Sequence, residues 1–227
     1  MIRVILWDID GTLVHTGHAG EIALVNAMAF LFGIETSLHD VDYKGRTDRQ
    51  IARNLLAKHG LPINDNTERT FVEAYLAELA LQLPQRQGHI YPGVREALLA
   101  LDAREDTHNA LLTGNMQRGA QLKLERYNLW HYFSFGAFAD HSRHRPDLGA
   151  HALQLARNRF GPNFAPNQLI VVGDTPHDVD CGRSVGARTI AVATGSFTVN
   201  DLGATGADAV FQDLSELQPF LEAIFAA

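Results

Sequence analysis

The chain alternates two patterns of hydrophobic and polar positions. Short apolar runs bounded by turn-forming residues are typical of strands buried on both faces of a parallel sheet. Between them, apolar residues recur every three or four positions, which predicts helices with one buried face. This alternation favours an α/β fold, a doubly wound parallel sheet with helices on both faces. The predicted strands are 2–7, 110–112, 169–172, 189–193 and 209–211, and the predicted helices between and after them are 94–101, 148–155 and 214–226.

One long segment breaks the alternation. Helical periodicity covers residues 19–32, 48–59 and 67–83, with no convincing strand among them. Thr47 and Gln50 predict a capping box at the start of the second helix. About seventy residues without a strand are too many for a simple crossover. We therefore predict an all-helical cap, residues 16–87, inserted into an α/β core domain formed by residues 1–15 and 88–227.

Three of the predicted strands end in polar residues. Ligands of an open parallel sheet bind beyond the carboxyl ends of its strands, so these residues are candidates for a site. Two neighbouring carboxylates repel each other unless a cation or a proton lies between them, so a strand that ends in Asp-x-Asp suggests that something uses the pair. The three strand ends read Asp8-Ile9-Asp10-Gly11-Thr12, Thr113-Gly114-Asn115 and Gly173-Asp174-Thr175-Pro176-His177-Asp178.

The chemistry that suits these residues is phosphoryl transfer at a hard cation. Four carboxylates at one sheet edge favour Mg²⁺ before Ca²⁺ or Mn²⁺. The Thr113 hydroxyl and the backbone N–H groups of Gly114 and Asn115 can donate to phosphate oxygens. A carboxylate beside Mg²⁺ can attack phosphorus, and a second acid can protonate the leaving oxygen and then deprotonate water.

The three motifs, in this order, resemble those of the haloacid dehalogenase-like hydrolase superfamily, whose phosphoglycolate-phosphatase-like members carry a helical cap after the first strand. The matching segments are VILWDIDGT, ALLTGN and VVGDTPHD, and the resemblance covers almost the whole chain. It implies a Rossmann-like core and a phosphatase that uses an aspartyl-phosphate intermediate and Mg²⁺.

The resemblance also implies a role for each matching residue. Asp8 corresponds to the nucleophile, and Asp10 to the general acid/base that also offers its backbone carbonyl to the metal. Thr113 corresponds to the hydroxyl that binds the transferred phosphoryl group. Asp174 corresponds to a metal-binding carboxylate, and Asp178 to its partner, which holds metal-bound water or the basic residue. The metal set is thus Asp8, Asp10, Asp174 and Asp178.

At the position of the family's basic residue, this chain differs from the common pattern. Many relatives have Lys-Pro, whereas this chain has Arg143-His144-Arg145-Pro146. Arg145 matches best, because it directly precedes proline and the next helix, and Arg143 is the alternative. Either cation can neutralise charge on the attacked phosphoryl group. Resemblance to capped relatives also makes Arg46 a candidate for substrate binding, and a simple loop before a helix is the other interpretation.

Composition and charge limit the classes of binding partner that this chain can have. The 227 residues are 46% hydrophobic, with a net charge of −7 and one cysteine. A net negative chain has no electrostatic footprint for nucleic acid or an anionic membrane. No apolar run approaches the roughly 20 residues that span a bilayer. We expect a small phosphorylated metabolite as the partner and a cytoplasmic location, and both a monomer and a homodimer stay open.

Several other functions remain possible on the same motifs. A sugar phosphomutase would keep both aspartates, and only analysis of the product separates it from a phosphatase. A haloacid hydrolase needs the nucleophile but not Asp10. A phosphonate-cleaving enzyme needs a cap lysine, for which Lys44 and Lys58 are available. A non-catalytic binding module should have lost motif carboxylates, and none is missing. The histidine pairs His15/His18 and His141/His144 are a weak metal signal without cysteines.

Overall fold

The computed structural model describes residues 1–226. In this range, one sheet of six parallel strands has the order β5-β4-β1-β6-β7-β8. The chain builds outward from β1 first on one side, through β4 and β5, and then on the other side, so β1 borders the switch point where ligands bind in open sheets. The strands are β1 Arg3–Trp7, β4 Thr107–Leu112, β5 Gly136–Ala137, β6 Leu169–Gly173, β7 Arg188–Val192 and β8 Ala209–Phe211.

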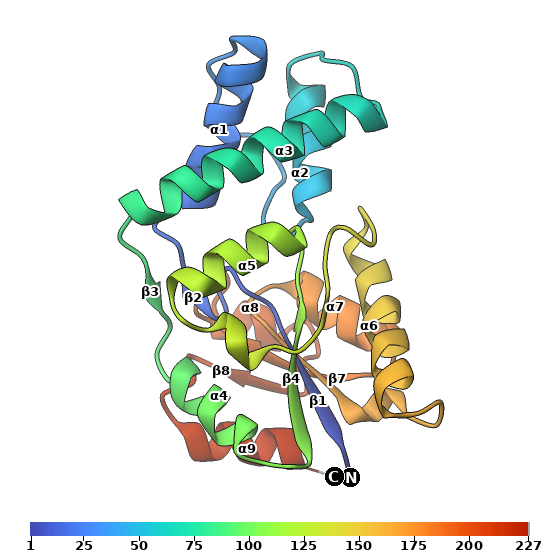
Figure 1. Cartoon of the computed structure of the whole chain (residues 1–227). Helices are drawn as coiled ribbons and strands as arrows, with labels where there is room; N and C mark the ends of the chain where they lie inside the picture. Colours follow the sequence, from blue (N-terminus) through green and yellow to red (C-terminus); the bar gives the residue numbers. More distant parts are fainter. Residues whose placement is uncertain (227) are drawn as a thin grey trace.

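Helices cover both faces of this sheet, which confirms the doubly wound α/β prediction (Figure 1). Successive side chains of a strand point to opposite faces. Ile5 and Trp7 pack in the cluster that holds α4, α5 and α9, whereas Val4 and Leu6 pack with α6 and α7. These helices are α4 Val94–Asp102, α5 Gln117–Arg126, α6 Arg145–Phe160, α7 Pro176–Ser184, α8 Val199–Gly203 and α9 Leu217–Phe225.

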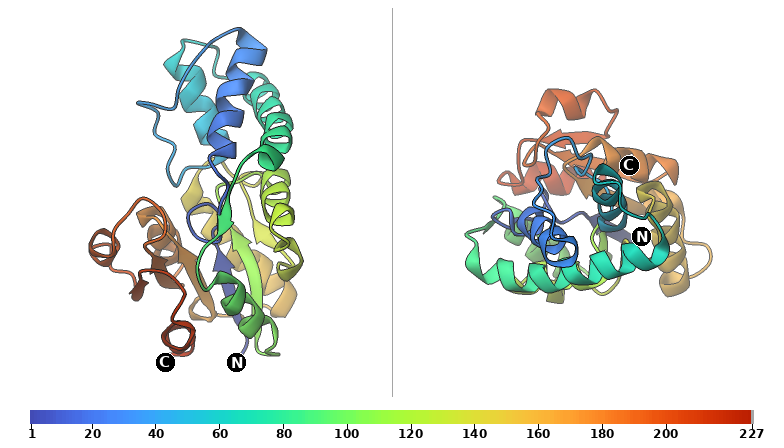
Figure 2. Two further views of the ribbon diagram at one scale, coloured as in Figure 1. Left: turned by 90° about the vertical axis from the view of Figure 1, so that its left-hand side faces the viewer. Right: turned by 90° about the horizontal axis from the view of Figure 1, so that it is seen from above.

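Three further helices stand together above the carboxyl ends of the central strands, and we call them the helical layer (Figures 1 and 2). They have a hydrophobic core of their own, which includes Ala23, Leu55 and Phe71. Two short strands, paired antiparallel, connect the layer to the sheet. The layer consists of α1 Ala19–Phe32, α2 Asp48–Lys58 and α3 Asp65–Gln82, followed by the turn Leu83–Gln85, and the connecting strands are β2 Val14–His15 and β3 His89–Ile90.

The structure differs from the sequence-based expectations in several elements. The strands β2, β3 and β5 have two residues each and leave no periodic pattern. The last helix begins at Leu217 rather than at residue 214, and the Leu214 backbone N–H donates to the Pro92 carbonyl. Thr47 does cap α2, since its hydroxyl accepts from the Gln50 N–H, but the Gln50 side chain donates to Asn54, so only half of the capping box forms.

None of the helices within residues 1–226 has both the length and the apolar character that a membrane crossing requires.

Candidate active site

The three polar strand ends meet because β1 lies between β4 and β6. Asp8 directly follows β1, and its backbone N–H donates to Val172 of β6 at 3.0 Å. Thr113 follows β4 and is fully buried. Asp174 follows β6 and is also buried. Side chains far apart in sequence are therefore brought to one edge by the parallel register alone.

Three carboxyl groups converge at this edge. Asp8, Asp174 and Asp178 are buried, and one carboxylate oxygen from each lies within 4.8 Å of the others. Burial raises the pKa of Asp8 to about 6, although Arg145 lowers it. Burial also raises the pKa of Asp174 well above its ordinary value, and Asp178 and Asp8 add to that rise. Such a cluster is costly without a nearby cation, so its donor set fits a hard divalent ion such as Mg²⁺.

The backbone makes room for the Asp174 carboxylate. A Cβ atom at Gly11 or at Gly195 would collide with it. Gly11 also has a φ of +87°, a conformation that favours glycine. The Thr12 hydroxyl donates to Asp174 at 3.2 Å. The loop after β1 and the loop after β7 thus hold this carboxylate from two sides.

Arg145, at the start of α6, is the cation that the structure brings to these acids. Its guanidinium lies 3.0 Å from Asp8 and contacts Asp178. It also donates to the Gly45 carbonyl of the helical layer at 3.1 Å. Arg143 instead pairs with Asp65 and Glu68 of α3. Of the two arginines, therefore, only Arg145 contacts the nucleophile candidate, although its catalytic role stays a prediction.

Thr113 and Asn115 connect the two aspartates of the first motif. The Thr113 hydroxyl favours the charged form of Asp8 and so lowers the Asp8 pKa, although burial raises it more. The Asn115 amide donates to Thr113 Oγ1 and to Asp10 Oδ2, each at 2.9 Å. Gly114 lies against the helical layer, because its carbonyl accepts from the Asp48 N–H at 2.7 Å. A Cβ at Gly114 would collide with the Arg46 carbonyl, so only glycine fits this contact.

Asp10 faces away from the three-carboxylate cluster and toward a lysine that the sequence analysis missed. Lys123 of α5 is buried, and its ammonium donates to Asp10 Oδ2 and to Asn115 Oδ1, each at 2.5 Å. Asp48 of α2 is buried nearby, and burial raises its pKa to about 6 against the lowering effect of Lys123. No motif points to Lys123, and the apolar period of its helix is too weak to have predicted α5.

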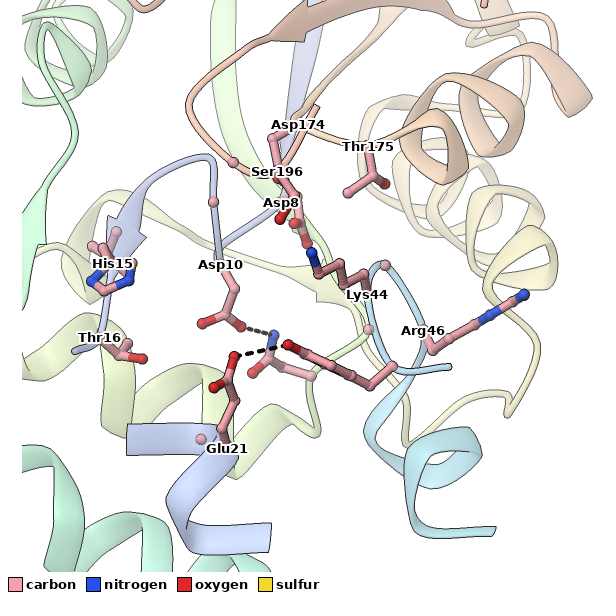
Figure 3. A pocket seen from close by; sticks show the side chains of 18 of the residues that line it. Asp8, Asp10, His15, Thr16, Glu21, Lys44, Arg46, Asp174, Thr175 and Ser196 are labelled. Atoms are coloured by element: carbon pink, nitrogen blue, oxygen red, sulfur yellow. Dashed lines mark hydrogen bonds between the residues drawn. The ribbon is translucent and has the colours of Figure 1, made fainter. Parts of the chain in front are cut away.

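A cavity of about 470 Å³ lies between the strand ends and the helical layer. Figure 3 shows Asp8, Asp10 and Asp174 on its sheet side and Glu21 and Lys44 on its helical side. Arg46 lines the cavity, but its side chain points away from the aspartates and pairs with Asp42 at 2.6 Å. The substrate-binding role of Arg46 stays a prediction.

The histidines stay outside the carboxylate cluster. His15 lines the cavity, and its ring lies 5.0 Å from that of His18 and 5.4 Å from that of His89. Burial lowers the pKa of His15, as do the two other histidines. Among the described residues, Asp8, Asp174 and Asp178 form the one group of three or more potential ligands close enough to hold a metal ion.

Comparison with known proteins decides the family. The family model described as haloacid dehalogenase-like hydrolase matches residues 5–192. The chain belongs to this family. Among its relatives, the probable phosphatase IndB of Dickeya dadantii is 31% identical, over 96% of this hydrolase and 92% of IndB. A phosphoglycolate phosphatase of Chromobacterium violaceum is 28% identical, over 97% of each chain.

Solved structures agree with the fold of this hydrolase. A predicted phosphoglycolate phosphatase from Haemophilus somnus has a TM-score of 0.76 and 18% identity, and the match covers 97% of the hydrolase and 98% of that chain. The resemblance that the motifs VILWDIDGT, ALLTGN and VVGDTPHD suggested is therefore confirmed. The hydrolase keeps a basic side chain beside Asp8, but it is Arg145 rather than the lysine that many relatives have.

Proposed function

We propose that the chain is a Mg²⁺-dependent phosphatase that hydrolyses a small phosphomonoester through an aspartyl phosphate on Asp8. The observation that carries the proposal is the convergence of Asp8, Asp174 and Asp178 with Arg145 at the floor of a cavity. Phosphatase names among the relatives support the same activity. Mg²⁺ would be held by Asp8, Asp174 and the Asp10 backbone carbonyl, with Asp178 alongside, and it would neutralise charge on the phosphoryl oxygens.

The side chains support a two-step reaction. An Asp8 oxygen attacks phosphorus while the bond to the ester oxygen breaks, and Asp10 gives that oxygen a proton. Water then attacks the phosphorus of the aspartyl phosphate, Asp10 accepts the proton, and Asp8 is released with inorganic phosphate. Thr113 and Arg145 donate to the phosphoryl oxygens in both steps, which stabilises the transition states. The Gly114 and Asn115 backbone N–H groups add further donors.

The helical layer suits the role of a cap. We infer that residues 16–87 form this cap on a core of residues 1–15 and 88–227, because β2 and β3 are the two connections between them. The cap side of the cavity carries Glu21, Tyr43 and Lys44, which would contact the leaving group and exclude water from the aspartyl phosphate. Arg46 would join them only after turning away from Asp42.

The test is phosphate release from a panel of phosphorylated metabolites, with Mg²⁺ and with EDTA. Asp8→Asn should reduce kcat/KM by at least about 10⁴-fold, because the nucleophile is lost. The matched control is Asp180→Asn, which removes an exposed carboxylate from α7 and should leave activity unchanged. Equal turnover with EDTA, or an active Asp8→Asn protein, contradicts the proposal.

Product analysis separates the alternatives on this fold. An isomerised sugar phosphate without free phosphate would indicate a mutase. If the enzyme cleaved phosphonates, borohydride would trap the substrate covalently on a lysine. That lysine would be Lys44, because Lys44 lines the cavity, whereas Lys58 donates to the backbone of Ser37 and His39. Halide release would indicate a haloacid hydrolase. Binding without turnover of any of these compounds would favour the non-catalytic module.

A further inference from the structure

Lys123 has an unusual position for a charged side chain. Only 4% of the side chain is exposed, although lysine is almost never buried without partners. Its ammonium donates to Asp10 Oδ2 and to Asn115 Oδ1, each at 2.5 Å. Lys123 is far in sequence from both the first motif and the helical layer, so the fold has brought it to the acid/base candidate of the proposed reaction.

The same ammonium lies where all three helices of the helical layer converge. Asp48 of α2 and Asp10 both attract Lys123 and raise its pKa, against the lowering effect of burial. Burial and the negative charge of Asp48 raise the pKa of the Tyr75 hydroxyl of α3. A Cβ at Gly20 of α1 would lie 3.9 Å from Lys123 Nζ and 3.8 Å from the Tyr75 hydroxyl. Lys123 therefore pairs directly with one carboxylate of the core and is attracted, without direct contact, by one carboxylate of the layer.

Asp48 is itself held against the core. Its carboxylate accepts from the Met116 N–H at 2.8 Å, and its own N–H donates to the Gly114 carbonyl at 2.7 Å. Both contacts are with the loop between β4 and α5, so they fix the start of α2 against the sheet domain. Where α2 is docked in this way, Asp48 anchors the two residues that flank Asn115, and Asn115 contacts both Lys123 and Asp10. The Asp48 charge also attracts the ammonium.

The hydrogen bonds of Asp10 occupy one of its two carboxylate oxygens and leave the other available for proton transfer. Oδ2 accepts from both Lys123 and Asn115. Within residues 1–226, Oδ1 has no hydrogen-bond partner, and 44% of the side chain is exposed to the cavity side. Two donors on one oxygen fix the carboxyl plane and direct the other oxygen toward the bound ester.

We propose that Lys123 is a positioning residue that orients Asp10 for proton transfer to the leaving group and does so only when Asp48 docks the helical layer. This inference rests on the proposed phosphatase function. Lys123 makes no contact with the phosphoryl group in this assignment, so its loss should affect the protonation of the leaving oxygen rather than the attack by Asp8.

The test compares two aryl esters whose leaving groups differ in basicity, phenyl phosphate and p-nitrophenyl phosphate. The p-nitrophenolate leaves readily without a proton, whereas phenolate needs the acid, and kcat/KM reports the steps up to its departure. Lys123→Met should lower kcat/KM about 10²-fold for phenyl phosphate and less than about threefold for p-nitrophenyl phosphate, in line with the usual contribution of a general acid. The control is Lys58→Met, which removes an exposed lysine of α2 and should change neither value.

A second variant tests the link to the helical layer. Asp48→Asn keeps an oxygen for the Met116 N–H but removes the charge. Like Lys123→Met, it should lower kcat/KM more for phenyl phosphate, by about tenfold, than for p-nitrophenyl phosphate. The double variant should lose no more kcat/KM for phenyl phosphate than Lys123→Met alone, because both substitutions act through the orientation of Asp10. Thermal unfolding of each variant verifies that the protein is folded.

The outcomes separate this inference from the function on which it rests. An equal loss for both esters in a folded Lys123→Met protein overturns the positioning role while leaving the phosphatase intact. Additive losses in the double variant overturn the coupling through Asp48. If the wild type releases phosphate from neither ester nor from any metabolite of the panel, the proposed function fails and this inference fails with it.

Discussion

Two groups of charged and polar side chains lie at the same cavity, and they are built differently. The strand-end cluster consists of Asp8, Asp174, Asp178 and Arg145; Asp8 and Asp174 directly follow strands of one sheet, whereas Asp178 and Arg145 lie in the first turns of α7 and α6. The lysine cluster consists of Asp10, Lys123, Asp48 and Tyr75, and three of its four members are on helices. Parallel strand register and two helix starts of the core place the first cluster, and the second exists only where the helical layer meets the core.

The charge balance of the two clusters also differs. The strand-end cluster sets three carboxyl groups against one guanidinium, whereas the lysine cluster sets two against one ammonium. Buried carboxylates that face one another need a further positive charge or a proton. A divalent cation therefore suits the first cluster, while direct hydrogen bonds from Lys123 already serve the second. The first is suited to bind and transfer phosphate, and the second to orient a proton donor.

After the loss of the nucleophile itself, the largest expected effect comes from removing the cation of the strand-end cluster. Arg145→Met should lower kcat/KM about 10³-fold, roughly 4 kcal/mol of transition-state stabilisation, because a buried donor to the phosphoryl group is lost. Arg145→Lys should lose about tenfold, since an ammonium lacks the planar fork that reaches both Asp8 and Asp178. Steady-state kinetics on the best substrate of the panel measures both values.

Arg143→Met is the matched control for that experiment. Arg143 pairs with Asp65 and Glu68 on α3, so its loss should change kcat/KM less than about threefold and affect mainly stability. If Arg143→Met lowered kcat/KM as much as Arg145→Met does, the assignment of Arg145 as the cation of the strand-end cluster would be contradicted.

The second effect is stabilisation by Mg²⁺, which should act on the strand-end cluster alone. At about a hundredfold excess over Kd, Mg²⁺ should add about 2.7 kcal/mol to the free energy of unfolding, roughly 5–10 °C in Tm. The shift should be smaller at pH 5 than at pH 7.5, because burial raises the pKa values of Asp8 and Asp174 and protons then compete with the ion. Thermal melts with Mg²⁺ and with EDTA provide the measurement.

Two variants sharpen the metal experiment. Asp174→Asn should abolish the Mg²⁺ shift, and Asp180→Asn, which changes an exposed carboxylate of α7, should retain it. An undiminished shift in Asp174→Asn would mean that the ion binds elsewhere.

The third effect belongs to the lysine cluster and appears without metal. Burial raises the pKa of Asp48 from 3.8 to about 6, so the folded protein binds a proton more tightly than the unfolded chain does. The free energy of unfolding should therefore fall as pH rises, by about 2 kcal/mol between pH 4.5 and pH 7 from this group. Asp48→Asn should remove that part of the slope, which denaturant titrations in EDTA at several pH values can measure. Parallel curves for wild type and Asp48→Asn would show that Asp48 titrates normally.

The strand-end cluster could be predicted from sequence for a physical reason. Asp8 and Asp174 follow apolar runs that are buried on both faces, and such runs can be recognised from composition alone. Asp178 belongs to the same motif as Asp174, four residues later. Parallel strands align their carboxyl ends, so three separate motifs imply one site. Arg145 could be placed because Pro146 marks the first turn of a helix, although only the structure distinguishes its contacts from those of Arg143.

The lysine cluster could not be predicted in this way. The buried side of α5 consists of Gly119, Ala120, Lys123 and Leu124, so its apolar signal is weak. Gly119 is small because α3 packs closely against it. Helix packing sets these contacts, and neither spacing nor propensity in one sequence encodes which helices meet. The orientation of Arg46 has the same origin, since its pairing with Asp42 depends on how the loop before α2 folds.

The smallest expected effect is at Cys181, which lies behind the strand-end cluster. Its thiol is fully buried and donates to the Arg145 backbone carbonyl at 3.3 Å. Burial raises the pKa of Cys181 to about 11, so the native thiol should not react with a disulfide reagent until the protein unfolds. Cys181→Ala should cost about 1 kcal/mol of stability, because one small group leaves a packed contact between α6 and α7, and should change kcat/KM less than about twofold. A tenfold loss of activity would mean that this thiol helps to hold Arg145 against Asp8, and the strand-end cluster would then depend on helix packing as much as the lysine cluster does.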